Sequence, residues 1–204
     1  MQQEPQRWMT RLGEPVGRFH AWWRGDPLPA LPGLSDLSII PSDDARTVAQ
    51  LLAIDAREIE ERMSRGHRPW LARIAGAVVG WGWSAAEELS IGELGISRPI
   101  PPGNRYLWDF FTVPPRRGRG IYPRLLQTIV SREVDADRFW LGHDLDNAAS
   151  ARGVAKSGFR EAGVLYRRQN DTFVLVPSAP RDRAVAAASL FGVAVADPCS
   201  VRVA

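Results

Sequence analysis

The pattern of apolar and polar residues predicts that the chain is built around a strand, a turn and a helix within residues 106–132. Residues 106–113 are rich in aromatic and β-branched side chains, which is the composition of a buried strand. Prolines at 114–115 cannot continue a hydrogen-bonded ladder, so the strand ends there. After a turn of arginines and glycines at 116–120, apolar residues recur at helical spacing: Ile121, Leu125, Leu126, Ile129 and Val130.

The segments on either side of this unit predict further strands and helices in alternation. Before it, the pattern predicts strands at 37–41, 69–74 and 77–85, a helical face at Val48, Leu51, Leu52 and Ile54 with Ser42 as its N-cap, and a helix at 56–64. After it, the pattern predicts a strand at 137–141, a helix at 148–156, a hairpin of 159–169 with 173–176, and a mild helix signal at 184–191. The connection 86–104 is less regular and is a place where substrate specificity can reside.

The first 34 residues are expected to form an arm. Seven apolar residues favour one face of a helix, although glycines and a proline interrupt it: Trp8, Met9, Leu12, Val16, Phe19, Trp22 and Trp23. A proline-rich connector follows at 25–33. We interpret the arm as a packing or dimer contact, with covering of a sheet edge as the alternative. The predicted division is therefore an arm at 1–34, a central domain at 35–177 and a C-terminal extension at 178–204.

Composition excludes several classes of protein. The chain has 204 residues, of which 45% are hydrophobic, enough for one domain with a core. The net charge of +3 is spread along the chain, so we expect no nucleic-acid partner. Cys199 is the only cysteine, which rules out an internal disulfide and favours a reducing compartment. No apolar run is long enough for a membrane span and the charged N-terminus is unlike a signal peptide, so we expect a cytoplasmic protein. We expect no metal site.

The turn at 116–120 has the chemistry of an anion site. The first N–H groups of a helix have no backbone partner, and the helix dipole places partial positive charge there. Arg116, Arg117 and Arg119 add guanidinium groups suited to phosphate oxygens. The turn therefore predicts a phosphate or pyrophosphate site, with a surface turn of solvated arginines as the alternative. It is not a P-loop, because no G-x-x-x-x-G-K-[ST] pattern is present.

Two motifs resemble those of the GNAT family of acyl-CoA N-acyltransferases. The family's pyrophosphate loop, [QR]-x-x-G-x-[GA], is matched by Arg117-Gly118-Arg119-Gly120-Ile121-Tyr122 except at the last position. A V-x-P pattern precedes it at 113–115. Further along, residues 147–150 (Asn-Ala-Ala-Ser) and 156–159 (Lys-Ser-Gly-Phe) resemble the second motif, an N-x-x-S helix that ends in a G-F turn. The resemblance covers roughly residues 37–177.

This resemblance implies an α+β fold in which helices flank a mixed, mostly antiparallel sheet. Two parallel strands, here 106–113 and 137–143, would splay apart and admit the pantetheine arm of acetyl-CoA. The backbone of Phe111 and Val113 would pair with pantetheine, and the acyl carbonyl would lie near Phe111. The implied cofactor-binding residues are Phe111, Thr112, Val113, Arg117, Gly118, Arg119, Gly120, Ile121, Tyr122, Asn147 and Ser150. A homodimer is also a family-level expectation.

The implied reaction is direct transfer of an acetyl group from acetyl-CoA to a primary amine of a small molecule or a protein. Such a transfer needs a group that accepts the proton of the attacking amine. Asp109, on the central strand, and His143, at the tip of its neighbour, are the candidate catalytic residues. Asp109 is alternatively a structural carboxylate paired with an arginine, and His143 a hydrogen-bonded residue at a strand end.

Two positions depart from the family pattern. Val154 stands four residues before the glycine of the G-F turn, where many family members have the tyrosine that protonates the leaving thiolate. Tyr122 replaces the small residue that ends the pyrophosphate loop, and we expect its backbone N–H to serve all the same. Ser150, Tyr166 or water are alternative sources of the proton. The competing interpretation is a non-catalytic acyl-CoA-binding sensor or scaffold of the same fold.

Overall fold

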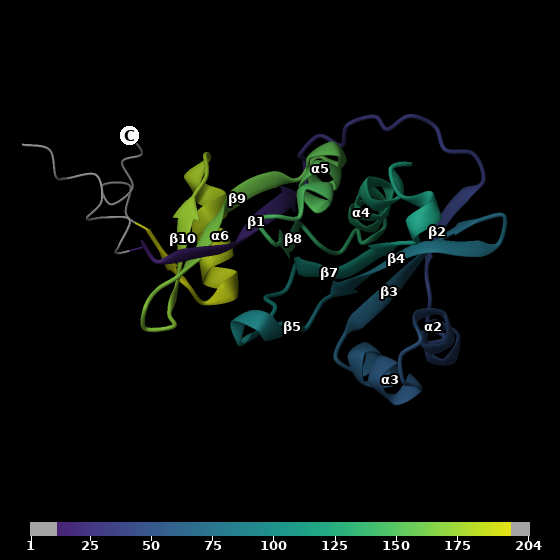
Figure 1. Ribbon diagram of the computed structural model, residues 1–204, viewed down its shortest axis with the longest axis horizontal. Coiled ribbons are helices and arrows are strands. Elements are labelled where there is room, and N and C mark those ends of the chain that lie inside the picture. Colours follow the sequence, from purple (N-terminus) through teal and green to yellow (C-terminus); the bar gives the residue numbers. More distant parts are fainter. Residues whose placement is uncertain (1–11, 197–204) are drawn as a thin grey trace, which may run out of the picture.

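The computed structural model describes residues 12–196, which form a nine-stranded mixed sheet with helices on both faces (Figure 1). The strands run across the sheet in the order β11 (Ala194–Val195), β10 (Phe173–Pro177), β9 (Arg160–Arg167), β1 (Glu14–Trp23), β8 (Arg138–His143), β7 (Asn104–Thr112), β4 (Ala77–Ala85), β3 (His67–Ile74) and β2 (Leu37–Pro41). All neighbours are antiparallel except β7 with β8 and β10 with β11. The expected α+β fold, with two parallel strands in a mostly antiparallel sheet, is confirmed.

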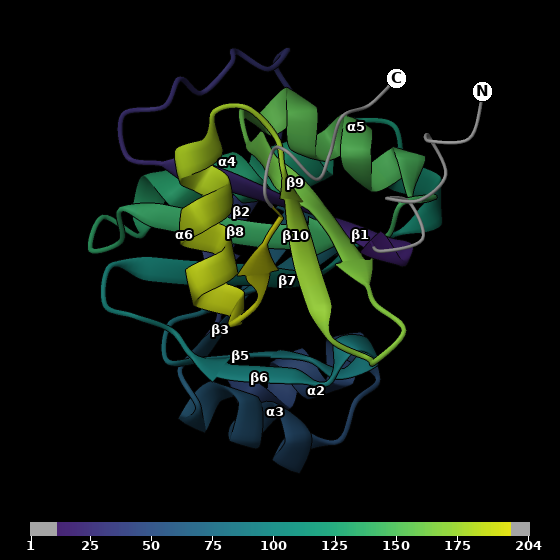
Figure 2. The ribbon, with the colours of Figure 1, turned by 90° about the vertical axis from the view of Figure 1, so that its left-hand side faces the viewer.

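The helices divide into two layers. Helices α4 (Ile121–Arg132) and α5 (Ala148–Ser157) lie above the sheet in Figure 1 and share a core with Leu107 of β7 and Leu141 of β8. The opposite layer contains α2 (Ala45–Leu52), α3 (Ala56–Ser64), α6 (Arg181–Phe191) and the separate hairpin of β5 (Glu88–Ile91) and β6 (Ile96–Pro99) (Figure 2). Tyr106 and Trp140, on the same two central strands, pack into that layer. Both faces of the central strands are therefore buried.

Capping residues fix the ends of the helices that matter for the site. The side chain of Asn147 accepts a hydrogen bond from the N–H of Ser150 at 2.9 Å, which begins α5. Gly158, in the left-handed region, ends the same helix. The second motif is thus a capped helix, as predicted. The expected N-cap of α2 was wrong, because Asp44 and not Ser42 accepts the N–H of Thr47.

The N-terminal arm differs from the expectation. Residues 14–23 form strand β1, not a helical face, and lie between β8 and β9 in the middle of the sheet. Phe19 and Ala21 face the α6 layer, whereas Trp22 faces the α4 layer. A strand buried on both faces is apolar on both sides, so its apolar residues do not alternate. These side chains pack inside the fold, so they no longer support a dimer surface. Trp8 and Met9 lie outside the described residues.

The C-terminal segment completes the α6 layer. The helix expected at 184–191 is present as α6, and Phe191 stacks on Phe19 with ring centroids 4.0 Å apart. The terminal hairpin is present as β9 and β10. The predicted boundaries at 34/35 and 177/178 remain predictions. Among residues 12–196, no helix is long and apolar enough to cross a membrane.

Candidate active site

The site is a gap between the two central parallel strands. β7 pairs with β8 only from Asn104 to Leu107, and beyond this point the two strands diverge. The space between them is a cavity of about 710 Å³. Side chains from both layers of the fold line it, among them Tyr122 and Ser150 from the α4 and α5 layer and Arg62, Ile91, Glu93 and Leu94 from the opposite layer. The gap is thus reached by residues from both faces of the sheet.

A β-bulge shapes β7 where it borders the gap. Trp81 pairs with Phe111 and Trp83 with Trp108, so Asp109 and Phe110 both lie opposite Gly82. Asp109 has a φ of 51°, in the left-handed region that is rare for residues other than glycine. The ring of Phe110 occupies the space that a Cβ on Gly82 would need. The extra residue re-aims the strand just where it leaves its partner.

The backbone groups of β7 that face the gap differ from those expected. The N–H of Val113 donates to the carbonyl of Val79 on β4 at 3.0 Å, so it points away from the gap. The expectation that the backbone of Phe111 and Val113 pairs with pantetheine stays a prediction, and the N–H of Val113 is already engaged by β4. In an antiparallel ladder, adjacent residues direct their groups to opposite sides. Accordingly, the carbonyl of Thr112 accepts a hydrogen bond from Nε–H of Arg117 at 3.0 Å. Thr112 is the residue of this segment whose backbone faces away from β4.

The predicted anion loop has the backbone geometry of an anion site. Gly120 precedes α4 with a φ of 74°, which a glycine adopts without strain. The N–H groups of residues 118–122 have no acceptor among the described residues. The same loop contains three arginines, Arg116, Arg117 and Arg119. The guanidinium carbon of Arg117 lies 5.4 Å from the centroid of the Phe111 ring. A row of free amides at a helix N-terminus beside guanidinium groups fits a pyrophosphate.

Tyr122 lies in the gap and not beside the loop. Its ring packs against Phe110 with centroids 5.1 Å apart and rests on Gly153 of α5, where a Cβ would overlap it. Its hydroxyl lies 3.4 Å from the hydroxyl oxygen of Ser150. Burial raises the pKa of Tyr122 to about 12. Both residues, expected near the cofactor, line the cavity together with Asn147, whose side-chain oxygen is used by the cap.

Asp109 is paired with an arginine. Its carboxylate lies 3.2 Å from Arg62 of α3, and the same guanidinium bonds Glu58 at 2.6 Å. Arg62 is also placed over the rings of Trp83 and Trp108, at 5.3 and 4.9 Å from their centroids. Asp109 is still partly exposed and lines the cavity. The structural alternative for Asp109 therefore holds in part, and Arg62 is a site residue that no local motif indicated.

His143 is held by a second histidine. Its Nδ1 lies 2.7 Å from the carbonyl oxygen of Asp144, so Nδ1 carries the proton. With the proton on Nδ1, Nε2 of His143 can accept the Nε2–H of His20 on β1 at 3.1 Å, and the two rings stack. Burial and the neighbouring His143 lower the pKa of His20 to about 4, so His20 is neutral near pH 7. Sequence reasoning missed His20 because it assigned this segment to a helical arm.

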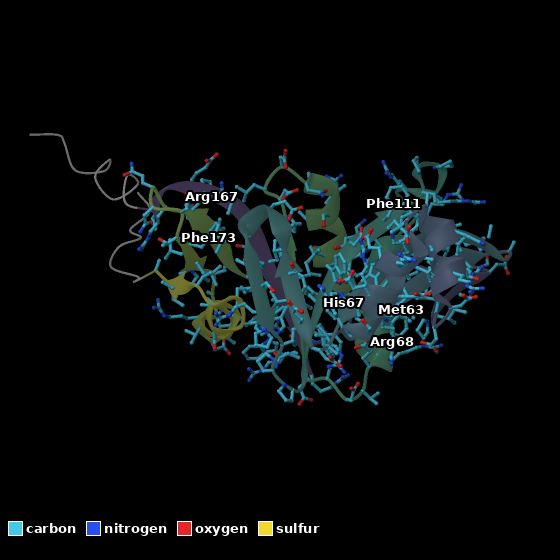
Figure 3. The ribbon with its side chains drawn as sticks, turned by 90° about the horizontal axis from the view of Figure 1, so that it is seen from below. Met63, His67, Arg68, Phe111, Arg167 and Phe173 are labelled. Carbon is cyan, nitrogen blue, oxygen red and sulfur yellow. The ribbon has the colours of Figure 1, made fainter. Side chains whose placement is uncertain are left out.

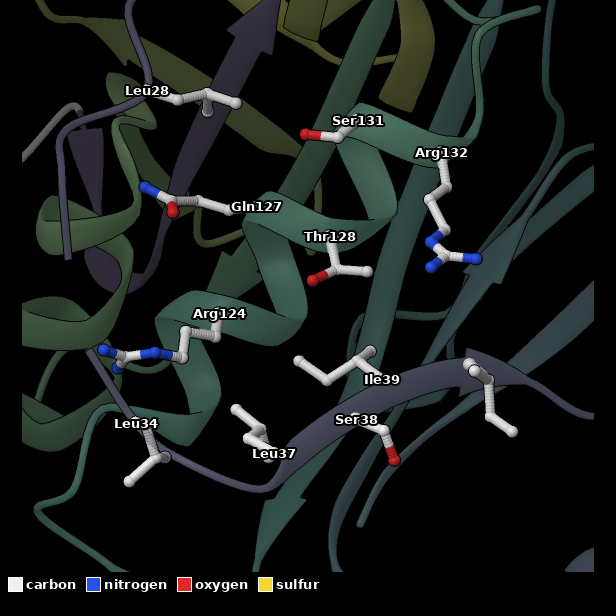
Figure 4. A pocket seen from close by; sticks show the side chains of 11 residues that line it. Leu28, Leu34, Leu37, Ser38, Ile39, Arg124, Gln127, Thr128, Ser131 and Arg132 are labelled. Atoms are coloured by element: carbon white, nitrogen blue, oxygen red, sulfur yellow. The ribbon is translucent and has the colours of Figure 1, made fainter. Parts of the chain in front are cut away.

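Further features lie outside the gap. Arg167 of β9, another cavity residue, lies over Phe173 at 5.6 Å, and the two are far from Phe111 in the view of Figure 3. A second cavity, of about 690 Å³, lies between α4 and the edge strand β2 and is lined by Arg124, Gln127, Leu37 and their neighbours (Figure 4). None of the predicted site residues lines this second cavity.

Comparison with known proteins agrees with the fold. A family model described as the Acetyltransferase (GNAT) family matches residues 37–159. A GCN5-related N-acetyltransferase from Kribbella flavida superimposes with a TM-score of 0.51 and 15% identity, covering 74% of this chain and 56% of that one. The aminoglycoside acetyltransferase AAC(6')-Ib, solved in complex with coenzyme A, gives a TM-score of 0.50 and 16% identity over 67% and 90% of the two chains. No curated protein matches the chain.

The chain covers only part of the first solved structures that it resembles. It spans 60% of a GNAT-family structure from Novosphingobium aromaticivorans, which has a TM-score of 0.48, 18% identity and 72% coverage of this chain, and 56% of the Kribbella flavida structure. At such identities the likeness concerns the fold. Strand β1 lies outside the segment that matches the family.

Proposed function

The chain belongs to the GNAT acetyltransferase family, and on this premise we propose that it transfers an acetyl group from acetyl-CoA directly to a primary amine. The observation that carries the proposal is the gap between β7 and β8, which side chains from both faces of the sheet line. Acetyl-CoA would enter from the α4 and α5 face, where the loop of free amides lies. The amine would enter from the face of α3 and the β5–β6 hairpin.

The residues present fit the two ends of acetyl-CoA. The pyrophosphate would bind the amides of residues 118–122 with help from the arginines of the loop. The pantetheine arm would follow the open side of β7, where Thr112 offers its backbone groups, towards the bulge at Asp109. The thioester would then lie in the cavity between the two layers. A backbone N–H at this point can stabilise the oxyanion that forms during acyl transfer.

The chemistry requires a neutral amine and a place for its proton. Asp109 lies on the acceptor side of the gap, where its carboxylate can bind an ammonium group and take up a proton through water. We assign His143 to the same cavity as the second candidate. Its Nε2 is already hydrogen-bonded to Nε2 of His20, so Asp109 is the more accessible acceptor.

Calorimetric titration with acetyl-CoA and with CoA tests the proposal. We expect micromolar binding by the wild type, and loss of binding by Gly120→Glu, whose carboxylate would occupy the anion loop. Gly25→Glu is the matched control, because Gly25 also has a positive φ (96°) but lies in an open turn after β1. If the wild type and Gly25→Glu bind acetyl-CoA and Gly120→Glu does not, the result supports the anion loop as the pyrophosphate site. Absence of binding by the folded wild type would rule out an acyl-CoA protein altogether.

A screen of amine acceptors then separates enzyme from sensor. The non-catalytic alternative is favoured by Val154, whose buried aliphatic side chain cannot donate a proton. Polyamines, aminoglycosides and peptide N-termini are the first acceptors to test, with release of free thiol as the readout. Turnover with any of them establishes a transferase. Tight CoA binding without turnover would favour the sensor.

A further inference from the structure

A phenol enters the gap from an unexpected element. α5 presents Val154 to the core, where it is fully buried, so this helix supplies no acidic side chain at that position. Tyr122 instead enters from the first turn of α4 and reaches across to α5. Its side chain lines the same cavity as Asp109 and His143.

The neighbours of Tyr122 are shaped to hold its ring in one place. Gly153 is the helix residue beneath the ring, and any larger residue there would collide with it. Phe110, displaced by the bulge of β7, packs on another side of the ring at 5.1 Å between centroids. The hydroxyl of Ser150, one helical turn before Val154, lies 3.4 Å from the phenol oxygen. Residues of α5 and β7 thus hold the ring of Tyr122 beside the cavity.

We propose that Tyr122 is the proton donor to the sulfur atom that leaves during acetyl transfer. This inference rests on the proposed function and assigns a catalytic residue to it. As the bond between the acyl carbon and sulfur breaks, its electron pair stays on sulfur, and the phenolic O–H gives its proton to that sulfur. The attacking amine loses one proton to its base, and that proton returns to the phenolate through water. The balance is one amine and one thioester giving one amide and one thiol.

The electrostatics of the phenol agree with this role. Because burial raises the pKa of Tyr122, the hydroxyl keeps its proton throughout the neutral range and is available as a donor. The weak contact with Ser150, at 3.4 Å, is its only hydrogen-bond partner among the described residues. With the ring fixed, the O–H bond of the phenol can still rotate towards a stronger acceptor such as a thiolate.

The other two tyrosines of the chain are less suitable. Tyr106 also lines the cavity, but its ring packs against Phe191 in the α6 layer, away from α4 and α5. Tyr166 lies on β9 and does not line the cavity. Tyr106→Phe is therefore a matched control, since it removes a buried phenolic hydroxyl from the same cavity at a different place.

The test measures ionisation of the thiol of bound CoA, which needs no acceptor. Thiolate formation is followed by ultraviolet absorbance against pH with saturating CoA, for the wild type, Tyr122→Phe and Tyr106→Phe. A hydrogen bond to a charged group is worth enough to shift a pKa by about one unit. We expect the thiol pKa to rise by about one unit in Tyr122→Phe and to stay unchanged in Tyr106→Phe. The other charged or titratable groups that line the cavity on both sides are common to all three proteins: Arg18, Arg62, Glu93, Asp109, His143, Asp144 and Arg167.

The outcomes distinguish failure of the Tyr122 assignment from failure of the proposed function. If all three proteins bind CoA with the same thiol pKa, Tyr122 is not the donor, although the proposed function stands. If the folded wild type binds no CoA, the proposed function fails and this inference with it. Once an acceptor is known, Tyr122→Phe should lower kcat by about 100-fold with little change in the Kd for CoA. A loss confined to CoA affinity would instead assign Tyr122 to binding.

Discussion

Asp109 combines a strained backbone with a place in the lining of the cavity. Its φ of 51° is imposed by the bulge, and a non-glycine residue in this region costs roughly 1–2 kcal/mol, least for Asp and Asn. We expect Asp109→Val to reduce the free energy of unfolding by about 1–2 kcal/mol, because a β-branched side chain tolerates this conformation poorly. Asp109→Asn should differ little in stability, since its ion pair with Arg62 is partly exposed.

Urea denaturation of both variants measures this difference. Equal stability of Asp109→Val and Asp109→Asn would mean that the strand does not hold its left-handed residue in solution. An activity assay tests the other proposed role of the Asp109 side chain, which is to accept a proton. Asn preserves the backbone but cannot take up a proton, so Asp109→Asn should lower turnover while Kd for CoA is unchanged, if Asp109 is the base.

His20 makes the stability of the protein depend on pH. The pKa of His20 is about 4 in the folded state, below the ordinary value of 6.5 expected in the unfolded chain. Between these values the unfolded state binds a proton that the folded state does not, so stability is complete above pH 6.5 and falls as pH decreases towards 4. The loss is about 3 kcal/mol for a shift of this size.

His20→Gln should remove that part of the acid dependence. Glutamine keeps an N–H donor towards His143 but does not titrate. We expect the stability of the variant to fall by about 3 kcal/mol less than that of the wild type between pH 6.5 and 4. His67, whose pKa burial also lowers, is present in both proteins and contributes equally. Parallel stability curves for the two proteins would contradict the buried, neutral state of His20.

At the level of the elements, local sequence predicted most of the architecture but misassigned one strand. The central strand, α4, the capped α5 and the terminal hairpin follow from apolar spacing, prolines and caps that act within a few residues. β1 was missed because an inner strand buried on both faces has no alternation, and its one glycine and one proline suggested an irregular arm. Its place between β8 and β9 depends on pairing with residues more than a hundred positions away.

The central place of β1 gives a stability prediction. Phe19 is buried and stacks on Phe191 of α6, so it joins the first described strand to the last helix. Phe19→Ala should reduce the free energy of unfolding by about 3–5 kcal/mol, the usual cost of emptying a buried aromatic site. Val134→Ala is the control, because Val134 is 76% exposed and its truncation should change stability by less than about 0.5 kcal/mol. A small effect at Phe19 would place β1 outside the folded core.

At the level of the whole molecule, the site depends on contacts that no local pattern contains. The anion loop and the second motif were readable because their residues are close in sequence. The partners that define their chemistry are distant: His20 lies 123 residues from His143, and Arg62 lies 47 residues from Asp109. The bulge, likewise, is visible only once β7 is paired with β4. Sequence therefore indicated the proposed cofactor loop better than the surroundings of Asp109 and His143.

Because side chains of both layers line the gap, we expect direct transfer without an acetyl-enzyme intermediate. In the proposed function, acetyl-CoA and the amine would occupy the cavity together from opposite faces, so no acetyl-enzyme would be needed. We expect no exchange of label between acetyl-CoA and radioactive CoA when the amine is absent, because direct transfer leaves the acetyl group on sulfur until the amine attacks. Exchange would require a residue of the chain to carry the acetyl group. Among the described residues of the cavity Ser150 is the one to test first, since loss of exchange in Ser150→Ala would show an acetyl-serine, and with it a two-step reaction in place of direct transfer.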